Sequence, residues 1–166
     1  VVLVPHPINL WMEESSPIKS PNYIFAINVD LSDSSFGDLV AFAEENGMRL
    51  FVKSSCEMDD IPQHVHIKKY YEDYSSKLEN ASFIVVHAPY NYRVSGVFYE
   101  CMSINKKIYF LNGITLFPIE MQKQYPQNVE IEVLENIKEL KPDASEFFEK
   151  HKKEKILKAL TDVISQ

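Results

Sequence analysis

Short apolar runs that alternate with amphipathic segments constrain the fold of this chain more than any other feature. The runs are Tyr23–Val29, Arg49–Lys53, His64–Ile67, Phe83–Val86, Ile108–Leu111 and Val129–Val133. Strands that alternate with helices of about ten residues are typical of βαβ units, which build a parallel sheet. Because such crossovers are right-handed, helices cover both faces of the sheet. The sequence therefore predicts an α/β fold with a doubly wound parallel sheet.

Caps and apolar faces indicate where the helices begin and end. Asp33 is the expected N-cap of a helix that has one apolar face, and Gly47 occupies the position of a left-handed C-cap after it. Further helices are expected over Tyr71–Leu78, Ser95–Ser103 and Leu116–Gln124. A capping box at Asp143–Glu146 predicts one terminal helix that runs to about Ile164.

The beginning of the chain differs in composition from the rest. Val1–Val4 is a short apolar run that prolines interrupt, and Glu13–Pro21 is rich in Ser and Pro. We therefore divide the chain into a strand and linker, residues 1–22, and one domain, residues 23–166.

The charge of the chain argues against nucleic acid as a partner. The net charge is −7, and the basic residues are interleaved with Asp and Glu along most of the sequence. Proteins that bind nucleic acid usually present a basic face to the phosphates. The lysine-rich segment Lys150–Lys158 is interpreted as a solvated helix face, and peripheral contact with an anionic membrane is the alternative.

Cysteine usage and hydropathy indicate a cytoplasmic protein. Cys56 and Cys101 are widely spaced and lie in no metal-ligand pattern, so reduced thiols are expected. No apolar run approaches the roughly 20 residues of a membrane span. We therefore expect a cytoplasmic location, with the inner face of the membrane as the alternative, and no bound metal.

The best candidate for a binding loop is Ala88–Val94, between a buried strand and the helix that opens at Ser95. The backbone amides of Ser95, Gly96 and Val97 would be free donors at a helix N-terminus, which suits a phosphate. Glu100 lies one turn later on the same face as Gly96 and leans back towards the N-terminus. We expect its carboxylate to accept hydrogen bonds from ribose hydroxyls.

The segment "ENASFIVVHAPYNYRVSGVFYECMSINKKIYFLNG" resembles the donor-binding signature of glycosyltransferases of the GT-B fold. In that signature a strand leads through a loop to a helix that contains a conserved Glu and ends near a Lys, as Glu100 and Lys106 do here. "VVLVPHPI" resembles the interdomain strand and linker of the same family.

The resemblance implies a Rossmann-like domain that is one half of a GT-B enzyme. Such a domain binds a nucleotide-diphosphate sugar as donor substrate, usually without a metal ion. It implies that Glu100 binds the ribose and that Ser95, Gly96 and Val97 bind the phosphates. The partner would be a missing N-terminal acceptor domain, with transfer to a polysaccharide or a lipid-linked acceptor.

The chain departs from the family pattern at several charged positions. Tyr92 stands where the retaining branch has a second Glu, and Asn28 and Ser35 stand where it has an Arg and a Lys. The nearest basic substitutes are Lys53 and Arg93. Tyr70, with its neighbour Tyr71, follows a strand where the family's nucleobase packs, so stacking is expected there. These departures favour binding over catalysis.

Two other functions remain open. The Ser-Gly pair and Glu100 also resemble nucleoside deoxyribosyltransferases, in which that Glu is the nucleophile. Alternatively, the missing charges indicate a degenerate GT-B half that serves as a non-catalytic scaffold. His87, at the end of the strand before the binding loop, is placed near a ligand by either enzyme hypothesis, although a structural hydrogen bond is its expected role.

Overall fold

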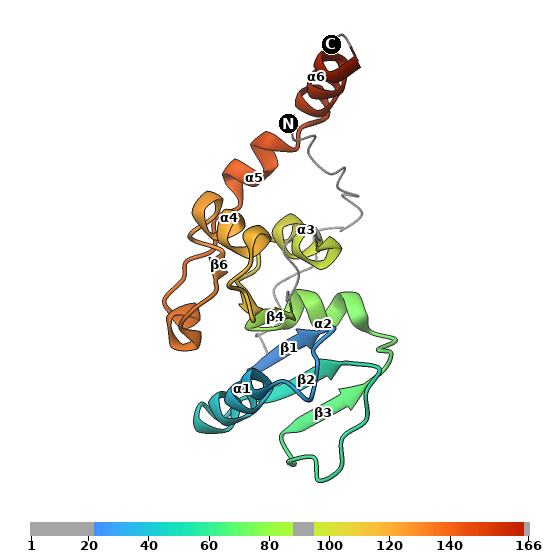
Figure 1. Ribbon diagram of the computed structural model, residues 1–166, viewed down its shortest axis with the longest axis vertical. Helices are drawn as coiled ribbons and strands as arrows, with labels where there is room; N and C mark the ends of the chain where they lie inside the picture. Colours follow the sequence, from blue (N-terminus) through green and yellow to red (C-terminus); the bar gives the residue numbers. More distant parts are fainter. Residues whose placement is uncertain (1–21, 88–94, 165–166) are drawn as a thin grey trace.

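A computed structural model, which describes residues 22–87 and 95–164, contains one parallel sheet with helices on both faces (Figure 1). The strands are β1 (Tyr23–Ile27), β2 (Arg49–Lys53), β3 (Val65–Lys68), β4 (Phe83–His87), β5 (Ile108–Leu111) and β6 (Val129–Glu130). Their order in the sheet is β3-β2-β1-β4-β5-β6, and every pairing is parallel. The predicted fold class, a Rossmann-like doubly wound sheet, is confirmed.

No helix separates β2 from β3, and the other strands are followed by helices. They are α1 (Ser34–Glu45), α2 (Tyr74–Asn80), α3 (Gly96–Ser103), α4 (Leu116–Gln124), α5 (Ser145–Lys150) and α6 (Lys153–Ile164), with a 3₁₀ helix, η1 (Leu134–Lys138). The helices predicted after the strands that begin at Tyr23, His64, Phe83 and Ile108 correspond to α1 to α4. Figure 1 shows α5 and α6 leading away from the sheet. None of the described helices has the length and apolar character needed to cross a membrane.

The two faces of the sheet carry separate apolar layers. Side chains alternate along each strand, so Phe25 and Ile84 point to one face while Ile24 and Val85 point to the other. Helices α2, α3 and α5 pack on the first face, and α1 and η1 pack on the second. The largest aromatic cluster surrounds the fully buried Phe98 of α3.

Several predicted elements differ in extent from the structure, and the terminal helix differs most. The terminal helix is two helices, because the His151 ring bonds back to the Phe147 carbonyl and the carbonyl of Lys152 starts a new set of helical bonds. The predicted capping box is also wrong. The N-cap of α5 is Ala144, which forms no side-chain capping bond, and Asp143 lies one residue before it and accepts a hydrogen bond from the amide of Ser145, the first residue of the helix. The expected strand at residues 1–4 lies outside the described residues.

The last strand is shorter than expected because of one side chain. One carboxylate oxygen of Glu130, Oε1, accepts hydrogen bonds from the backbone amides of Ile131, Glu132 and Val133, at 2.9, 3.0 and 3.5 Å. Those amides are then unavailable for a strand ladder. β6 therefore ends at Glu130, and the unpredicted η1 follows.

The predicted helix over Tyr71–Leu78 starts one turn later. Tyr71 is buried before α2, and its hydroxyl donates to the carbonyls of His66 and Val52, at 2.7 and 3.3 Å. These bonds fix Tyr71 against the sheet and place the start of α2 at Tyr74.

We expect Gly113→Ala to lower the free energy of unfolding by about 1–3 kcal/mol, because a Cβ there overpacks the turn after β5. The added atom would lie 2.7 Å from the Phe110 carbonyl oxygen and 3.1 Å from the Ile131 Cβ. The matched control is Gly37→Ala on α1, where a Cβ meets nothing within 4 Å. The control should raise stability by up to about 1 kcal/mol. Urea unfolding measures both, and equal effects would contradict the packing argument.

Candidate functional site

A cleft of about 700 Å³ lies at the edge of the sheet where β1, β2 and β4 end. It is lined by Asn28, Val29, Asp30, Asp33, Lys53, Ser54, Ser55, Cys56, Lys69 and His87. β1 and β4 are neighbours in the sheet, although β2 and β3 lie between them in sequence. The cleft is therefore at the point where the strand order reverses, which is where open α/β sheets bind ligands.

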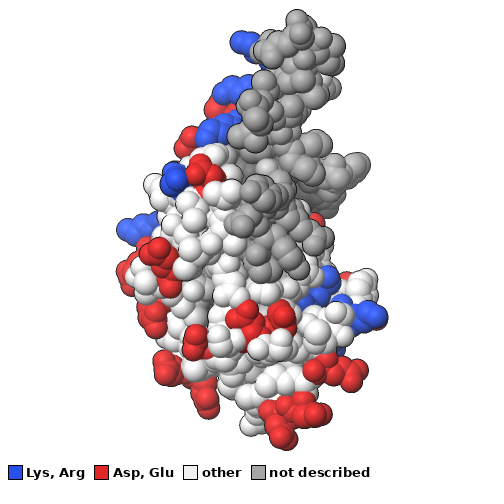
Figure 2. All heavy atoms as spheres, in the orientation of Figure 1, with Lys and Arg blue, Asp and Glu red and all other residues white. Residues whose placement is uncertain are grey.

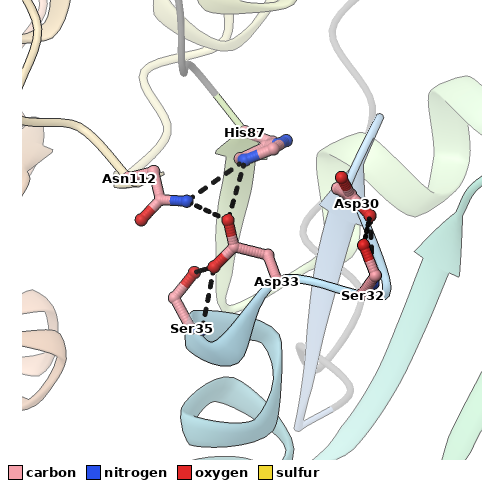
Figure 3. Close-up of polar contacts among 6 residues, drawn as sticks. All are labelled: Asp30, Ser32, Asp33, Ser35, His87 and Asn112. Atoms are coloured by element: carbon pink, nitrogen blue, oxygen red, sulfur yellow. Dashed lines mark hydrogen bonds and ion pairs between the residues drawn. The ribbon is translucent and has the colours of Figure 1, made fainter.

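Asp33 connects three strand ends within this edge (Figure 3). Its Oδ1 caps α1 by accepting hydrogen bonds from the amide and hydroxyl of Ser35, at 2.9 and 2.5 Å. Its Oδ2 accepts a hydrogen bond from Asn112 after β5 and lies 3.8 Å from Nε2 of His87 at the end of β4. The bonds from Ser35 hold the pKa of Asp33 below its ordinary value, so the carboxylate is charged at neutral pH.

A second carboxylate, Asp30, lies in the same loop. Its Oδ1 accepts hydrogen bonds from the amide and hydroxyl of Ser32, at 3.0 and 2.7 Å, and these bonds lower the pKa of Asp30. The loop begins at Asn28, whose φ of 57° lies in the left-handed region that Asn tolerates better than most residues. This turn brings Asp30 and Asp33 back over the ends of the strands.

Two lysines bring positive charge to the cleft. Lys53 is the last residue of β2, and Lys69 follows β3. Within the described part of the chain, neither ammonium group forms an ion pair. Their charges are therefore available to an anionic ligand.

A second cavity of about 470 Å³ adjoins the cleft. The two share Ser54, Ser55, Cys56 and Lys69, and the second is also lined by Glu57, Met58, Ile61, Ile67 and Lys68. Together they offer charged groups next to a few apolar side chains. This combination suits a ligand with an anionic part and a flat or apolar part.

The predicted phosphate-binding residues lie at the beginning of α3. Ser95 is the N-cap, and its hydroxyl oxygen accepts a hydrogen bond from the amide of Phe98 at 3.3 Å. Gly96 is exposed, with no atom within 4 Å of the position of a Cβ, and Val97 is partly buried against the core. These residues do not line the cleft. They lie at the same edge of the sheet, because α3 follows β4.

Glu100 is exposed and is held by a phenol rather than by a cation. Its Oε2 accepts a hydrogen bond of 2.9 Å from the Tyr74 hydroxyl of α2. Burial, and then the neighbouring Glu100 carboxylate, raises the pKa of Tyr74 well above its ordinary value, so the phenol stays protonated. Glu100 forms no ion pair with any described residue, so no cation of the described part of the chain neutralises its charge.

The remaining predicted binding residues are Tyr70 and Arg93, and only the first lies in the described part of the chain. Tyr70 is 70% exposed and follows Lys69, so its ring is free to stack on a ligand. Arg93 and Tyr92 lie outside the described residues. Among residues 22–87 and 95–164, no three His, Cys, Asp or Glu side chains are grouped so that they could hold a metal ion.

The sequence pattern did not predict that four residues lie at this edge of the sheet, where a ligand could bind. They are Asp30, Asp33, Lys69 and Asn112. Asp33 was expected only as a helix cap, and its contacts with His87 and Asn112 join residues far apart in sequence. The available signal was the position of each residue just after a predicted strand.

We expect Asp33→Ala to lower the free energy of unfolding at pH 7 by about 1 kcal/mol, the usual loss for a helix N-cap. Because the folded state lowers the Asp33 pKa below 3.8, its stabilisation is present above pH 3.8 and is lost as the pH falls through the folded-state pKa. The difference between wild type and variant should therefore shrink in acid. Asp33→Asn, which keeps a capping oxygen, is the control and should cost less. A difference that is constant with pH would contradict the role of the charge.

Comparison with known proteins gives a likeness in structure and none in sequence. No known family model matches the chain, and no curated protein matches it. Among solved structures, a similar chain is described as the glycotransferase of kitacinnamycin, with 12% sequence identity and a TM-score of 0.49. The alignment covers 97% of this chain and 43% of that one, so this chain spans less than half of that protein's length. A similarity at this level assigns no function.

Proposed function

We propose that this chain is the donor-binding half of a GT-B glycosyltransferase and that it binds a nucleotide-diphosphate sugar at the carboxyl edge of its sheet. The observation that carries the proposal is the cleft at the β1/β4 switch point, which holds two lysines without ion-pair partners in the described chain. The resemblance of the segment around Glu100 to the donor-binding signature supports it.

Lys53 and Lys69 supply the charge that a diphosphate requires. They take the place of the basic residues that Asn28 and Ser35 do not provide. The amides at the start of α3, around Gly96, would add hydrogen bonds and a positive helix end. Metal-independent binding follows from this proposal, because lysines and amides then balance the phosphate charge.

The remaining contacts fit the other parts of such a ligand. The exposed carboxylate of Glu100 would accept hydrogen bonds from ribose hydroxyls. The exposed ring of Tyr70 would stack on the base, and Met58, Ile61 and Ile67 of the adjoining cavity would contact the less polar part of the ligand. A scaffold role is less well supported, because Glu100 is exposed and bound by no cation of the described chain.

Transfer itself would need a second domain that brings the acceptor. We propose that this partner precedes the linker, residues 1–22, in the full protein and that the acceptor is a polysaccharide or lipid-linked sugar. A cytoplasmic location at or near the inner face of the membrane fits such an acceptor. The isolated chain would then bind the donor without turning it over, because the acceptor is not positioned.

Calorimetric titration of the 166-residue chain with UDP, GDP, ADP and CMP tests the proposal. We expect one nucleoside diphosphate to bind with 1:1 stoichiometry and CMP, which has a single phosphate, to bind more weakly. If the folded chain binds none of the four, the proposed function is wrong. Release of free base from a deoxynucleoside, abolished by Glu100→Gln, would instead support the deoxyribosyltransferase alternative.

Cys56 provides an independent probe of where the nucleotide binds. It is exposed and lines both cavities, whereas Cys101 is fully buried and burial raises the pKa of its thiol. We therefore expect iodoacetamide to label Cys56 alone. A bound nucleoside diphosphate should slow this labelling, as followed by mass spectrometry. Unchanged labelling of Cys56 at saturating ligand would place the nucleotide elsewhere.

A further inference from the structure

A third cavity, of about 390 Å³, lies on the other side of α1 from the cleft, between α1 and the segment that follows β6. Its lining is Ser35, Asp38, Ala41, Phe42, Glu45, Tyr109, Leu111, Glu132, Val133, Leu134 and Glu135. The floor is aromatic and aliphatic, whereas acidic side chains surround the opening. The proposed donor site uses none of these residues.

The carboxylates of this cavity have no cationic partner in the described part of the chain. Asp38 and Glu45 come from α1, and Glu132 and Glu135 come from the segment after β6. None of the four side chains forms an ion pair with a described residue. Figure 2 shows acidic side chains gathered over this part of the molecule. No ion pair among the described residues therefore balances this negative charge.

The nearest described cation lies beside the cavity and does not fill it. The Lys138 ammonium packs on the Phe42 ring, 4.8 Å from its centroid, and donates a hydrogen bond to the Asn46 side chain. It bonds none of the four carboxylates and is not part of the lining. Lys138 therefore lies outside the cavity.

A largely buried tyrosine opens on the same cavity. Tyr109 of β5 is only 8% exposed, and its hydroxyl makes no hydrogen bond to any described residue. Among the described residues no buried side-chain oxygen or nitrogen lacks a partner, so the Tyr109 hydroxyl itself reaches the open space of the cavity, whereas the hydroxyls of Tyr71 and Tyr74 are bonded within the protein. Burial, with the nearby carboxylates of Glu130, Glu135 and Asp38, raises the pKa of Tyr109. The hydroxyl therefore faces negative charge and is available to accept a hydrogen bond.

We propose that this cavity binds an organic cation, an ammonium or guanidinium group on a short aliphatic stem. The charged head would lie between Asp38 and Glu135 and donate a hydrogen bond to the Tyr109 hydroxyl. The stem would pack on Phe42 and Leu111. A metal ion is a poorer fit, because the floor is apolar and no group of three metal-binding side chains is found among the described residues.

The cation has two sources, a free amine or a Lys or Arg side chain of another polypeptide, and the probes separate them. Butylammonium and butylguanidinium represent the free molecule, and the capped peptides Gly-Lys-Gly and Gly-Arg-Gly represent the side chain. Binding is followed by the amide chemical shifts of the 15N-labelled chain, with sodium chloride as the ionic-strength control. We expect millimolar binding that shifts the amides of residues 132–135 and Tyr109. Tighter binding of the free cations would point to a small molecule, and tighter binding of the peptides to a partner chain.

The double variant Asp38→Asn with Glu135→Gln tests the site directly. We expect binding to weaken about tenfold, because two charge contacts with the ligand are lost. The control Glu44→Gln with Glu139→Gln removes the same charge from exposed positions outside the lining and should leave binding nearly unchanged. Tyr109→Phe should weaken binding about threefold through the lost hydrogen bond. It remains a test if the double variant does not fold.

The proposal is wrong if no probe shifts these amides, if the control pair weakens binding as much as the lining pair, or if Tyr109→Phe and the double variant both bind as the wild type does. Because the donor site is not involved, nucleoside diphosphate binding should be unaffected in every variant. Failure here therefore does not bear on the proposed function.

Discussion

Phe98→Ala should lower the free energy of unfolding by about 3–5 kcal/mol, the range for removing a buried aromatic ring. Phe98 is fully buried in α3 and contacts rings from β5, α4 and α5. Its ring lies 6.0 Å from that of Phe110, 5.5 Å from Phe117 and 6.2 Å from Phe147, centroid to centroid. Because these neighbours belong to separate elements, they cannot all move in to fill the space. Urea unfolding followed by circular dichroism measures the loss.

The control is Phe148→Ala, which removes the same ring from a position that is 37% exposed. We expect a loss below about 1 kcal/mol there, because less apolar area is removed from the folded state. Similar losses at the two positions would mean that the cluster around Phe98 does not organise this face of the sheet. The position of α3, and with it the proposed phosphate site, would then need another explanation.

Lys53→Met with Lys69→Met should weaken binding of the nucleoside diphosphate by at least about tenfold, and by about a hundredfold if both lysines contact phosphate. Hydrogen bonds to charged groups contribute about 1.5–3 kcal/mol each, and tenfold corresponds to about 1.4 kcal/mol. Met keeps most of the aliphatic stem, so the loss reports the ammonium groups. Calorimetric titration measures the affinity, and raising the salt concentration should weaken the wild type more than the variant.

The matched control is Lys141→Met with Lys158→Met, two exposed lysines outside the cleft. It changes the net charge by the same amount, so it separates local contacts from the overall field of the molecule. If both double variants lose affinity equally, the lysines act only through net charge. If neither loses affinity, the diphosphate lies closer to the start of α3, and the cleft is not its site.

The strands and most helices could be predicted because their signals are local. Arg49–Lys53, Ile108–Leu111 and Leu116–Gln124 have the same bounds in the sequence prediction and in the structure. Buried parallel strands are continuous apolar runs, and their ends are marked by polar residues, so the pattern defines them without knowledge of neighbours.

The parts that were missed depend on side chains that bond across the chain. The end of β6 is decided by Glu130, and the break between α5 and α6 occurs where His151 bonds back to Phe147. Neither bond changes hydrophobic periodicity, so neither can be found from it.

In the candidate site, too, some residues could be predicted from local sequence signals and others could not. Lys53 and the cap at Ser95 follow from the positions of strand ends and helix starts, and the structure has them there. Asp33 contacts His87 and Asn112, which lie at the ends of two other strands. Asp33 and His87 are more than 50 residues apart along the chain, and His87 and Asn112 are more than 20 apart, so only the folded sheet brings the three together. Which of these residues touch a ligand stays a prediction.

The Glu130 carboxylate has a consequence for how the molecule meets other copies of itself. β6 is an edge strand, and an edge with a long row of free backbone groups can template pairing with another chain. Because Glu130 binds the next three amides, the edge offers only two residues in strand conformation. The same side chain that shortens the strand thereby protects this edge of the sheet from intermolecular association.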